Sequence, residues 1–203
     1  MSSLQSGLKD IIFMTWPTLF ISLVVLVSIR ITYLIKNKEK FVLYREILFL
    51  LFVLYILCLF QVVTAQDINS LDGNNLIPFK EILRYKFGSH YFIKNIVGNV
   101  IMFAPYGFFV GKYASLKNSR LTLFLLFLAS FSIEITQLII GRVFDVDDII
   151  LNVFGGLLGY IAYRFTDNIL NVLPKFFRSE IVLNILSVLL LICSGFIIMK
   201  VVL

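Results

Sequence analysis

Long apolar runs recur along this chain, separated by short polar stretches. Four runs, at 11–29, 47–66, 95–111 and 181–199, contain no Asp, Glu, Lys or Arg. Each is close to the ~20 residues that cross a bilayer as a helix. Two weaker runs follow the same pattern: 121–141, interrupted by Glu134, and 149–163, which is short unless Arg164 extends to the headgroups. The pattern predicts an all-α, polytopic membrane helix bundle of six transmembrane helices, or five if 149–163 is re-entrant.

Composition supports a membrane protein and excludes an ordinary soluble domain. The chain is 60% hydrophobic and 15% charged, with a mean hydropathy of +0.96. We expect a single membrane domain over 1–203, because no linker or repeat divides it. The formal charge of +6 fits attraction to anionic lipids, so membrane lipids are expected partners and nucleic acid is not. Lys and Arg are more frequent in alternate loops, which predicts that both termini, the 66–94 loop and the 141–148 turn lie outside the cell.

The long connection before the third run contains a candidate surface helix at 78–87. Pro78 suits a first helical position, and Phe79, Ile82, Leu83 and Phe87 recur at helical spacing. Basic residues lie between them, so the segment is predicted to rest on the outer membrane surface. The alternative is a loop that only caps the bundle.

The third run carries amides in an apolar setting. Asn95 and Asn99 are four residues apart and so share a helix face, with Tyr106 further along the same stripe. Polar amides in lipid need partners. The two amides either form hydrogen bonds to neighbouring helices, worth about 1 kcal/mol each, or belong to a polar site.

Glu134 lies near the middle of the fourth run, where an acidic residue costs about 2.5–3.5 kcal/mol to insert. It must therefore face the bundle interior. Gln137 is on the same face and Arg142 is two turns further, so a carboxylate, an amide and a cation can border one cavity. An ion pair that fixes packing is the alternative to a binding group.

Three carboxylates, Asp145, Asp147 and Asp148, precede the fifth helix. One is explained as a helix N-cap, but three exceed what capping needs. Asp148 and Asn152 are four apart and continue a polar face into the membrane. Clustered carboxylate oxygens are also the ligands that a divalent cation prefers, but spacing in the sequence alone does not establish the geometry of a metal site. We predict no metal and no cofactor.

Known catalytic motifs are absent from the sequence: it has no Gly-x-Ser-x-Gly, no Cys/His pair, no His-Glu-x-x-His and no phosphate-binding loop. The single histidine, His90, falls in the outer loop. Whether the protein is an enzyme stays open, and Glu134 and Asp148 are the candidates for a general base.

Four ordered motifs, "NLIPFKEI", "NIVGNVIMFAPYGFFVG", "SIEITQ" and "GRVFDVDDIILNVFGGLLGY", resemble the VanZ-like family of bacterial membrane proteins. The resemblance covers about 75–163. The family is named after the teicoplanin-resistance protein. The resemblance implies a role in the bacterial cell envelope and, for some members, reduced susceptibility to teicoplanin and lipoglycopeptides, with no settled biochemical activity. The matching positions are Asn75, Pro78, Phe79, Asn95, Asn99, Phe103, Pro105, Gly107, Glu134, Gln137, Arg142, Asp145, Asp148, Asn152, Gly155 and Gly159.

These features together predict an outward-facing polar pocket in the cell membrane that binds a lipid headgroup or glycopeptide. The expected ligand is a lipoglycopeptide or a lipid-linked cell-wall precursor. An embedded enzyme acting on a lipid-linked substrate and a transporter are the alternatives. The predicted ligand-binding residues are Asn95, Asn99, Glu134, Gln137, Arg142, Asp145, Asp148 and Asn152.

Overall fold

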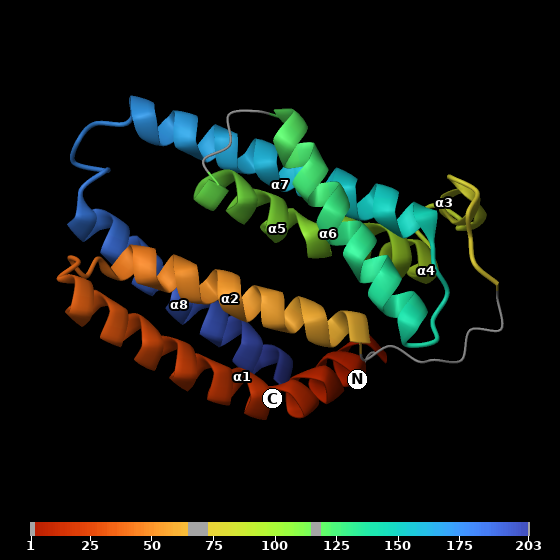
Figure 1. Ribbon diagram of the computed structural model, residues 1–203, viewed down its shortest axis with the longest axis horizontal. Helices are drawn as coiled ribbons and strands as arrows, with labels where there is room; N and C mark the ends of the chain where they lie inside the picture. Colours follow the sequence, from red (N-terminus) through yellow and green to blue (C-terminus); the bar gives the residue numbers. More distant parts are fainter. Residues whose placement is uncertain (1–2, 65–72, 115–118, 203) are drawn as a thin grey trace. The chain divides into compact units, whose positions relative to one another are not determined.

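A computed structural model of the protein describes residues 3–64, 73–114 and 119–202. The regular elements in these ranges are helices, as the apolar periodicity predicts (Figure 1). They are α1 (Ser3–Asn37), α2 (Leu43–Thr64), α3 (Lys80–Arg84), α4 (His90–Phe92), the π-helical turn η1 (Ile93–Val97), α5 (Gly98–Ala114), α6 (Ser119–Ile139), α7 (Val146–Val172) and α8 (Glu180–Val202).

Five described helical segments are long and apolar enough to cross a membrane: Trp16–Asn37 of α1, α2, the continuous stretch His90–Ala114, α6 and α7. This confirms the helical membrane bundle, and the protein is multi-pass. The sixth predicted span corresponds to α8, whose apolar part in the described range, Glu180–Cys193, is shorter than the others. A sixth crossing therefore stays a prediction.

The fifth predicted span is longer than its apolar run. The sequence suggested 149–163, whereas α7 extends from Val146 to Val172, 27 residues in all. At a rise of about 1.5 Å per residue, a helix of this length crosses the ~30 Å hydrocarbon layer without a re-entrant turn. Charged residues at both ends concealed this length, because the apolar run stops where the helix does not.

The chain folds into two compact units, one holding α1, α2 and α8 and the other formed by residues 66–169. In the first unit, Arg30 of α1 forms a bidentate ion pair with Glu46 of α2, at 2.7 and 3.0 Å. The side-chain oxygen of Asn184 on α8 accepts a hydrogen bond from the Tyr44 amide of α2 at 2.9 Å. Polar pairs of this kind join apolar helices that lipid would otherwise solvate equally well.

In the second unit, glycines let α5 and α7 approach closely, as the GxxxG spacing predicts. A Cβ atom on Gly155 would lie 2.8 Å from the carbonyl carbon of Val100, and one on Gly159 would lie 2.7 Å from that of Ala104. Leu126 of α6 packs on the neighbouring Gly156, so α6 also contacts α7. These contacts align the polar residues of the three helices.

The loop helix is shorter than predicted. The sequence favoured a helix over 78–87, but α3 covers only Lys80–Arg84. Phe79 adopts a left-handed backbone with φ of 65°, which is unfavourable for a residue with a side chain and prevents a helix from starting at Pro78. Gly88, with φ of 75°, then turns the chain toward α4.

Candidate functional site

The candidate site lies where α6 ends and α7 begins. Gly141, with φ of 86°, ends the α6 turn in a left-handed conformation that glycine adopts at no steric cost. The following segment is extended and pairs with the outer loop: Asn75 donates its amide to the Phe144 carbonyl at 2.9 Å, and Val146 donates to the Asn75 carbonyl at 3.0 Å. The loop is thereby fixed against the start of α7.

Asp147 anchors the loop helix to α7. Its carboxylate accepts hydrogen bonds from the backbone amides of Phe79, Glu81 and Ile82, the last two at 2.7 and 3.2 Å. These amides belong to the first turn of α3, which has no carbonyl partners of its own, and the carboxylate complements the helix dipole. Asp147 is 1% exposed, so its charge is held by loop amides rather than by solvent.

Asp145 continues this network. Its Oδ1 accepts from the Asn75 side-chain amide and from the Asp147 backbone amide, each at 2.8 Å. Burial raises the pKa of the Asp145 carboxyl above its usual range, while these two hydrogen bonds favour the charged form and oppose the rise. Asp145 therefore occupies a setting in which burial and hydrogen bonding compete over its proton.

The buried Glu134 of α6 holds the turn between α6 and α7 by hydrogen bonding. Its Oε2 accepts from the Asp145 amide at 3.0 Å. The hydrogen-bonding neighbours orient the Gln137 amide so that its nitrogen donates to Glu134 Oε1 at 2.8 Å and its oxygen accepts from Arg142 Nη1 at 2.6 Å. The carboxylate, amide and cation predicted on one face thus form a chain of hydrogen bonds. Gln137 links the two charged side chains by hydrogen bonds to both.

Asp148 and Asn99 join α7 to α5. The Asn99 side-chain amide donates a hydrogen bond to Asp148 Oδ1 at 2.6 Å. One turn deeper, the buried Asn152 donates to the Ser130 hydroxyl of α6 at 3.1 Å, and its own Oδ1 has no hydrogen-bond partner. The polar face of α7 therefore contacts both neighbouring helices.

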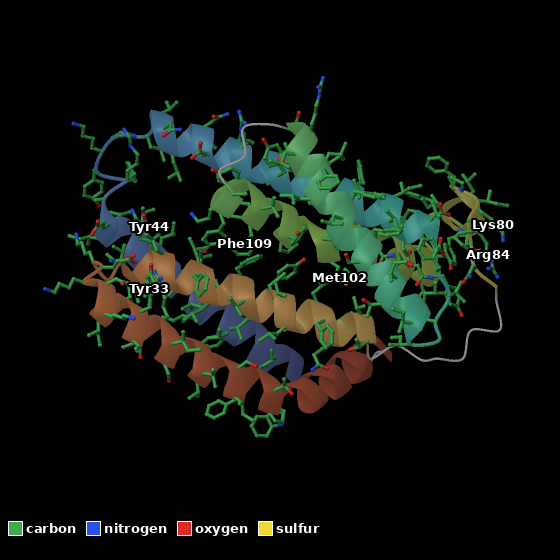
Figure 2. All side chains as sticks on the ribbon, in the orientation of Figure 1. Tyr33, Tyr44, Lys80, Arg84, Met102 and Phe109 are labelled. Carbon is green, nitrogen blue, oxygen red and sulfur yellow. The ribbon has the colours of Figure 1, made fainter. Side chains whose placement is uncertain are left out.

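These elements enclose a cavity of about 690 Å³, which we call the polar cavity. Four basic and four acidic side chains line it, together with three asparagines and a tyrosine. Figure 2 shows Lys80 and Arg84 on the α3 segment. The charged lining residues are Lys80, Arg84, Lys94, Arg142, Glu81, Asp145, Asp147 and Asp148.

Five of the eight predicted ligand-binding residues line this cavity: Asn95, Asn99, Arg142, Asp145 and Asp148. The other three are buried and do not belong to its lining. Glu134 is 1% exposed, Asn152 is 2% and Gln137 is 7%. Glu134 and Gln137 hold the lining residues Asp145 and Arg142, whereas Asn152 donates to Ser130.

Sequence reasoning did not assign the basic and amide residues that the outer loop adds to the lining. Asn75, Lys80, Arg84 and Lys94 come from this loop and the start of the third span. The available signal was the cationic side of the 78–87 segment, which the sequence had suggested would face lipid phosphates. The same cations at the cavity suit an anionic group of a ligand.

Among the described residues, no group of three or more His, Cys, Asp or Glu side chains is placed to hold a metal ion. Three carboxylates of the turn are instead engaged by amides: Asp145 by Asn75, Asp147 by α3, and Asp148 by Asn99. The cavity offers cations, carboxylate oxygens and amides together. It is therefore suited to a polar ligand that carries an anionic group beside hydroxyl or amine donors.

The fold and the cavity define a multi-pass helical membrane protein with a polar cavity at the adjoining ends of two spans. A family model described as VanZ/LLP1 matches residues 46–171, so the chain belongs to the VanZ/LLP1 family. The matched region contains every residue that lines the cavity and extends beyond the 75–163 core expected from the motifs. Neither the curated proteins nor the solved structures compared with the chain give a match.

Proposed function

We propose that this chain is a bacterial cell-envelope protein whose polar cavity binds the headgroup of an amphiphile at the outer surface of the cell membrane. The amphiphile is the lipoglycopeptide teicoplanin or a lipid-linked cell-wall precursor, and binding reduces susceptibility to the drug. The observation that carries the proposal is the polar cavity itself, with charges of both signs and a fixed hydrogen-bonded base.

The volume of the cavity fits a headgroup. About 690 Å³ lies within the range of roughly 300–1,000 Å³ that small-molecule sites occupy. It is suited to a phosphate with part of a sugar, or to one exposed portion of a glycopeptide.

The proposed contacts follow from the lining. Arg142, with Lys80 and Lys94 at the loop, contacts an anionic group, because guanidinium and ammonium donors form charge-assisted hydrogen bonds to such groups. Asp148 accepts a hydrogen bond from a sugar hydroxyl or an amine. Asn99 orients Asp148 by holding its Oδ1.

The location supports a ligand from the membrane surface. The cavity lies beside the C-terminal end of α6 and the N-terminal end of α7, both candidate spans, and not at their centres. Such a site is reached from the headgroup layer. The distribution of Lys and Arg predicts that this end faces outward, where teicoplanin acts.

The proposal is tested by teicoplanin susceptibility of a Gram-positive host that expresses the wild type, Arg142→Gln or Asp148→Asn at equal membrane levels. Arg178→Gln and Asp167→Asn are matched controls, because both residues are exposed and lie outside the cavity. We expect the wild type and both controls to protect and the two cavity variants to lose protection. Equal protection by all five proteins would contradict the proposal.

A membrane-embedded enzyme is the second candidate, favoured by one observation. Asp148 lines the cavity with one carboxylate oxygen held by Asn99, an arrangement that also suits a general base. Mass spectrometry of envelope lipids and of recovered teicoplanin separates the two. A binding protein leaves both chemically unchanged, whereas an enzyme yields a modified product that Asp148→Asn abolishes.

A further inference from the structure

A second concave surface lies on the same unit, between α6 and α7. It has a volume of about 570 Å³, and all nine of its lining residues are apolar. We call it the apolar groove. Its residues are Phe127, Phe131, Phe144, Val146, Ile149, Ile150, Val153, Phe154 and Leu157.

The groove has the depth of one membrane leaflet. On α7 its lining begins at Val146, the first residue of the helix, and ends at Leu157. Eleven residues at about 1.5 Å each make roughly 16 Å, which is half of the ~30 Å hydrocarbon layer. The groove therefore has about the length of the layer that the lipid chains of one leaflet fill, measured from the N-terminal end of α7.

The groove and the polar cavity adjoin at the segment that precedes α7 and along the first turns of α7. Asp145 lines the cavity, whereas its neighbours Phe144 and Val146 line the groove. This follows from the extended backbone that pairs with Asn75, since successive side chains of an extended segment point to opposite sides. The Phe144 ring contacts Phe131 of α6 edge-on at a centroid distance of 6.3 Å, so aromatic rings line the surface end of the groove.

We infer that the apolar groove binds the hydrocarbon chain of the amphiphile whose headgroup occupies the polar cavity, an inference that rests on the proposed function. A headgroup in the cavity places its chain beside the 144–146 segment, at the surface end of the groove. A concave wall encloses more of a chain than the convex face of a single helix does. The nearby cations and the apolar groove together select a ligand with an anionic head and one chain of about leaflet length.

Photoactivatable alkyl phosphates test this inference. Dodecyl and hexadecyl phosphate, each with a diazirine at the chain end, are added to the full-length protein in nanodiscs, and labelled residues are mapped by mass spectrometry. We expect hexadecyl labels at the deep end of the groove, near Leu157, and dodecyl labels nearer the surface. Inorganic phosphate should reduce both, because it competes for the cavity.

Leu157→Trp and Leu158→Trp form a matched pair. The first fills the deep end of the groove, and the second places the same residue on the neighbouring exposed position outside it. Leu157→Trp should reduce hexadecyl labelling of the groove severalfold and spare dodecyl labelling, because the indole ring fills space at the deep end that only the longer chain reaches. Leu158→Trp should change neither.

Two results would overturn the inference. Labels spread evenly over lipid-facing positions, or equal behaviour of the two tryptophan variants, would show that the groove holds no particular chain. If Arg142→Gln and inorganic phosphate leave labelling of the groove unchanged, the chain binds there independently of a headgroup in the polar cavity. Failure of this inference is distinguished from failure of the proposed function by the teicoplanin susceptibility test, because that test leaves the groove residues unaltered.

Discussion

Replacement of Gly155 by alanine perturbs the contact that brings α5 and α7 together. The new Cβ would lie 2.8 Å from the carbonyl carbon of Val100 and closer still to its oxygen. Ordinary van der Waals contact begins at 3.4 Å, so the shortfall at the carbonyl carbon alone is 0.6 Å, the difference between 3.4 and 2.8 Å. The helices must separate by more than this, because the carbonyl oxygen is the nearer obstacle. Backbone forms the obstacle on α5, and backbone cannot rotate away as a flexible side chain would.

The displacement reaches the site through Asn99, the residue before Val100. If the helices part as rigid bodies, the 2.6 Å hydrogen bond from Asn99 to Asp148 lengthens by more than 0.6 Å, to beyond 3.2 Å. That distance exceeds the range of about 2.7–3.2 Å for N–H···O hydrogen bonds in proteins. We therefore expect Gly155→Ala to lower the free energy of unfolding by about 2 kcal/mol, within the range for overpacking, and to weaken ligand binding at the cavity.

Gly195→Ala is the matched control. Gly195 also lies inside a helix, α8, but a Cβ there would meet no atom within 4 Å. Both substitutions gain the helix propensity of alanine over glycine, about 0.5–1 kcal/mol, so the difference between them isolates the clash. The assay is reversible unfolding by sodium dodecyl sulfate in micelles, followed by circular dichroism. Equal unfolding free energies for the two variants would refute the proposed helix contact.

Three further predictions concern the loop, the turn and the first unit. Asp147→Asn should speed hydrogen exchange of the α3 amides about tenfold, measured by mass spectrometry, because a neutral oxygen accepts less strongly than a carboxylate; Asp167→Asn, an exposed position, should not. Because burial raises the pKa of Asp145 in the fold, the folded state binds this proton more tightly than the unfolded chain. Stability should therefore fall as pH rises from about 4 through the raised pKa, and Asp145→Asn should reduce this dependence in unfolding measured across pH. Glu46→Gln should cost about 1–3 kcal/mol by leaving Arg30 with only the longer 3.9 Å ion pair to Glu39, and Arg30→Met with Glu46→Leu should restore much of this in an unfolding cycle.

The hydrophobic pattern predicted the helical class and the inward position of Glu134, because inserting an unpaired charge into lipid has a large cost. It also placed Asn99 and Asp148 each on a polar helix face among the predicted pocket residues, through the four-residue spacing of polar positions on each span. These inferences depend on one helix at a time, and helical periodicity supplies them directly.

Sequence reasoning could not find the role of Asp147. Its partners are amides of a loop nearly seventy residues earlier in the chain, and they become available only because Phe79 adopts a left-handed backbone. Helix propensity favoured an earlier start at Pro78, and the tertiary contact with Asp147 prevailed over it. The position of the loop cations at the cavity was not predicted for the same reason, since it depends on the contact between Asp147 and the loop.

The buried layer under the cavity shows why three predicted ligand residues do not line it. Glu134 holds the amide of Asp145, and Gln137 links Glu134 to Arg142. A pattern of polar residues on one face does not distinguish a side chain that lines a cavity from one that supports it. Whether a polar side chain lines the cavity depends on its position along the helix relative to the turn and the loop. Those positions are set by tertiary contacts that the pattern of one helix does not contain.

Binding of fluorescent teicoplanin, and of a fluorescent lipid-linked cell-wall precursor, to the purified protein in nanodiscs is the most direct test of the polar cavity. The wild type should bind at least one of the two. Arg142→Gln and Asp148→Asn should each weaken that binding about tenfold or more, as expected for loss of a hydrogen bond to a charged group, while Arg178→Gln leaves it unchanged. No binding of either ligand, or the same affinity for all four proteins, would contradict a ligand-binding role for the cavity.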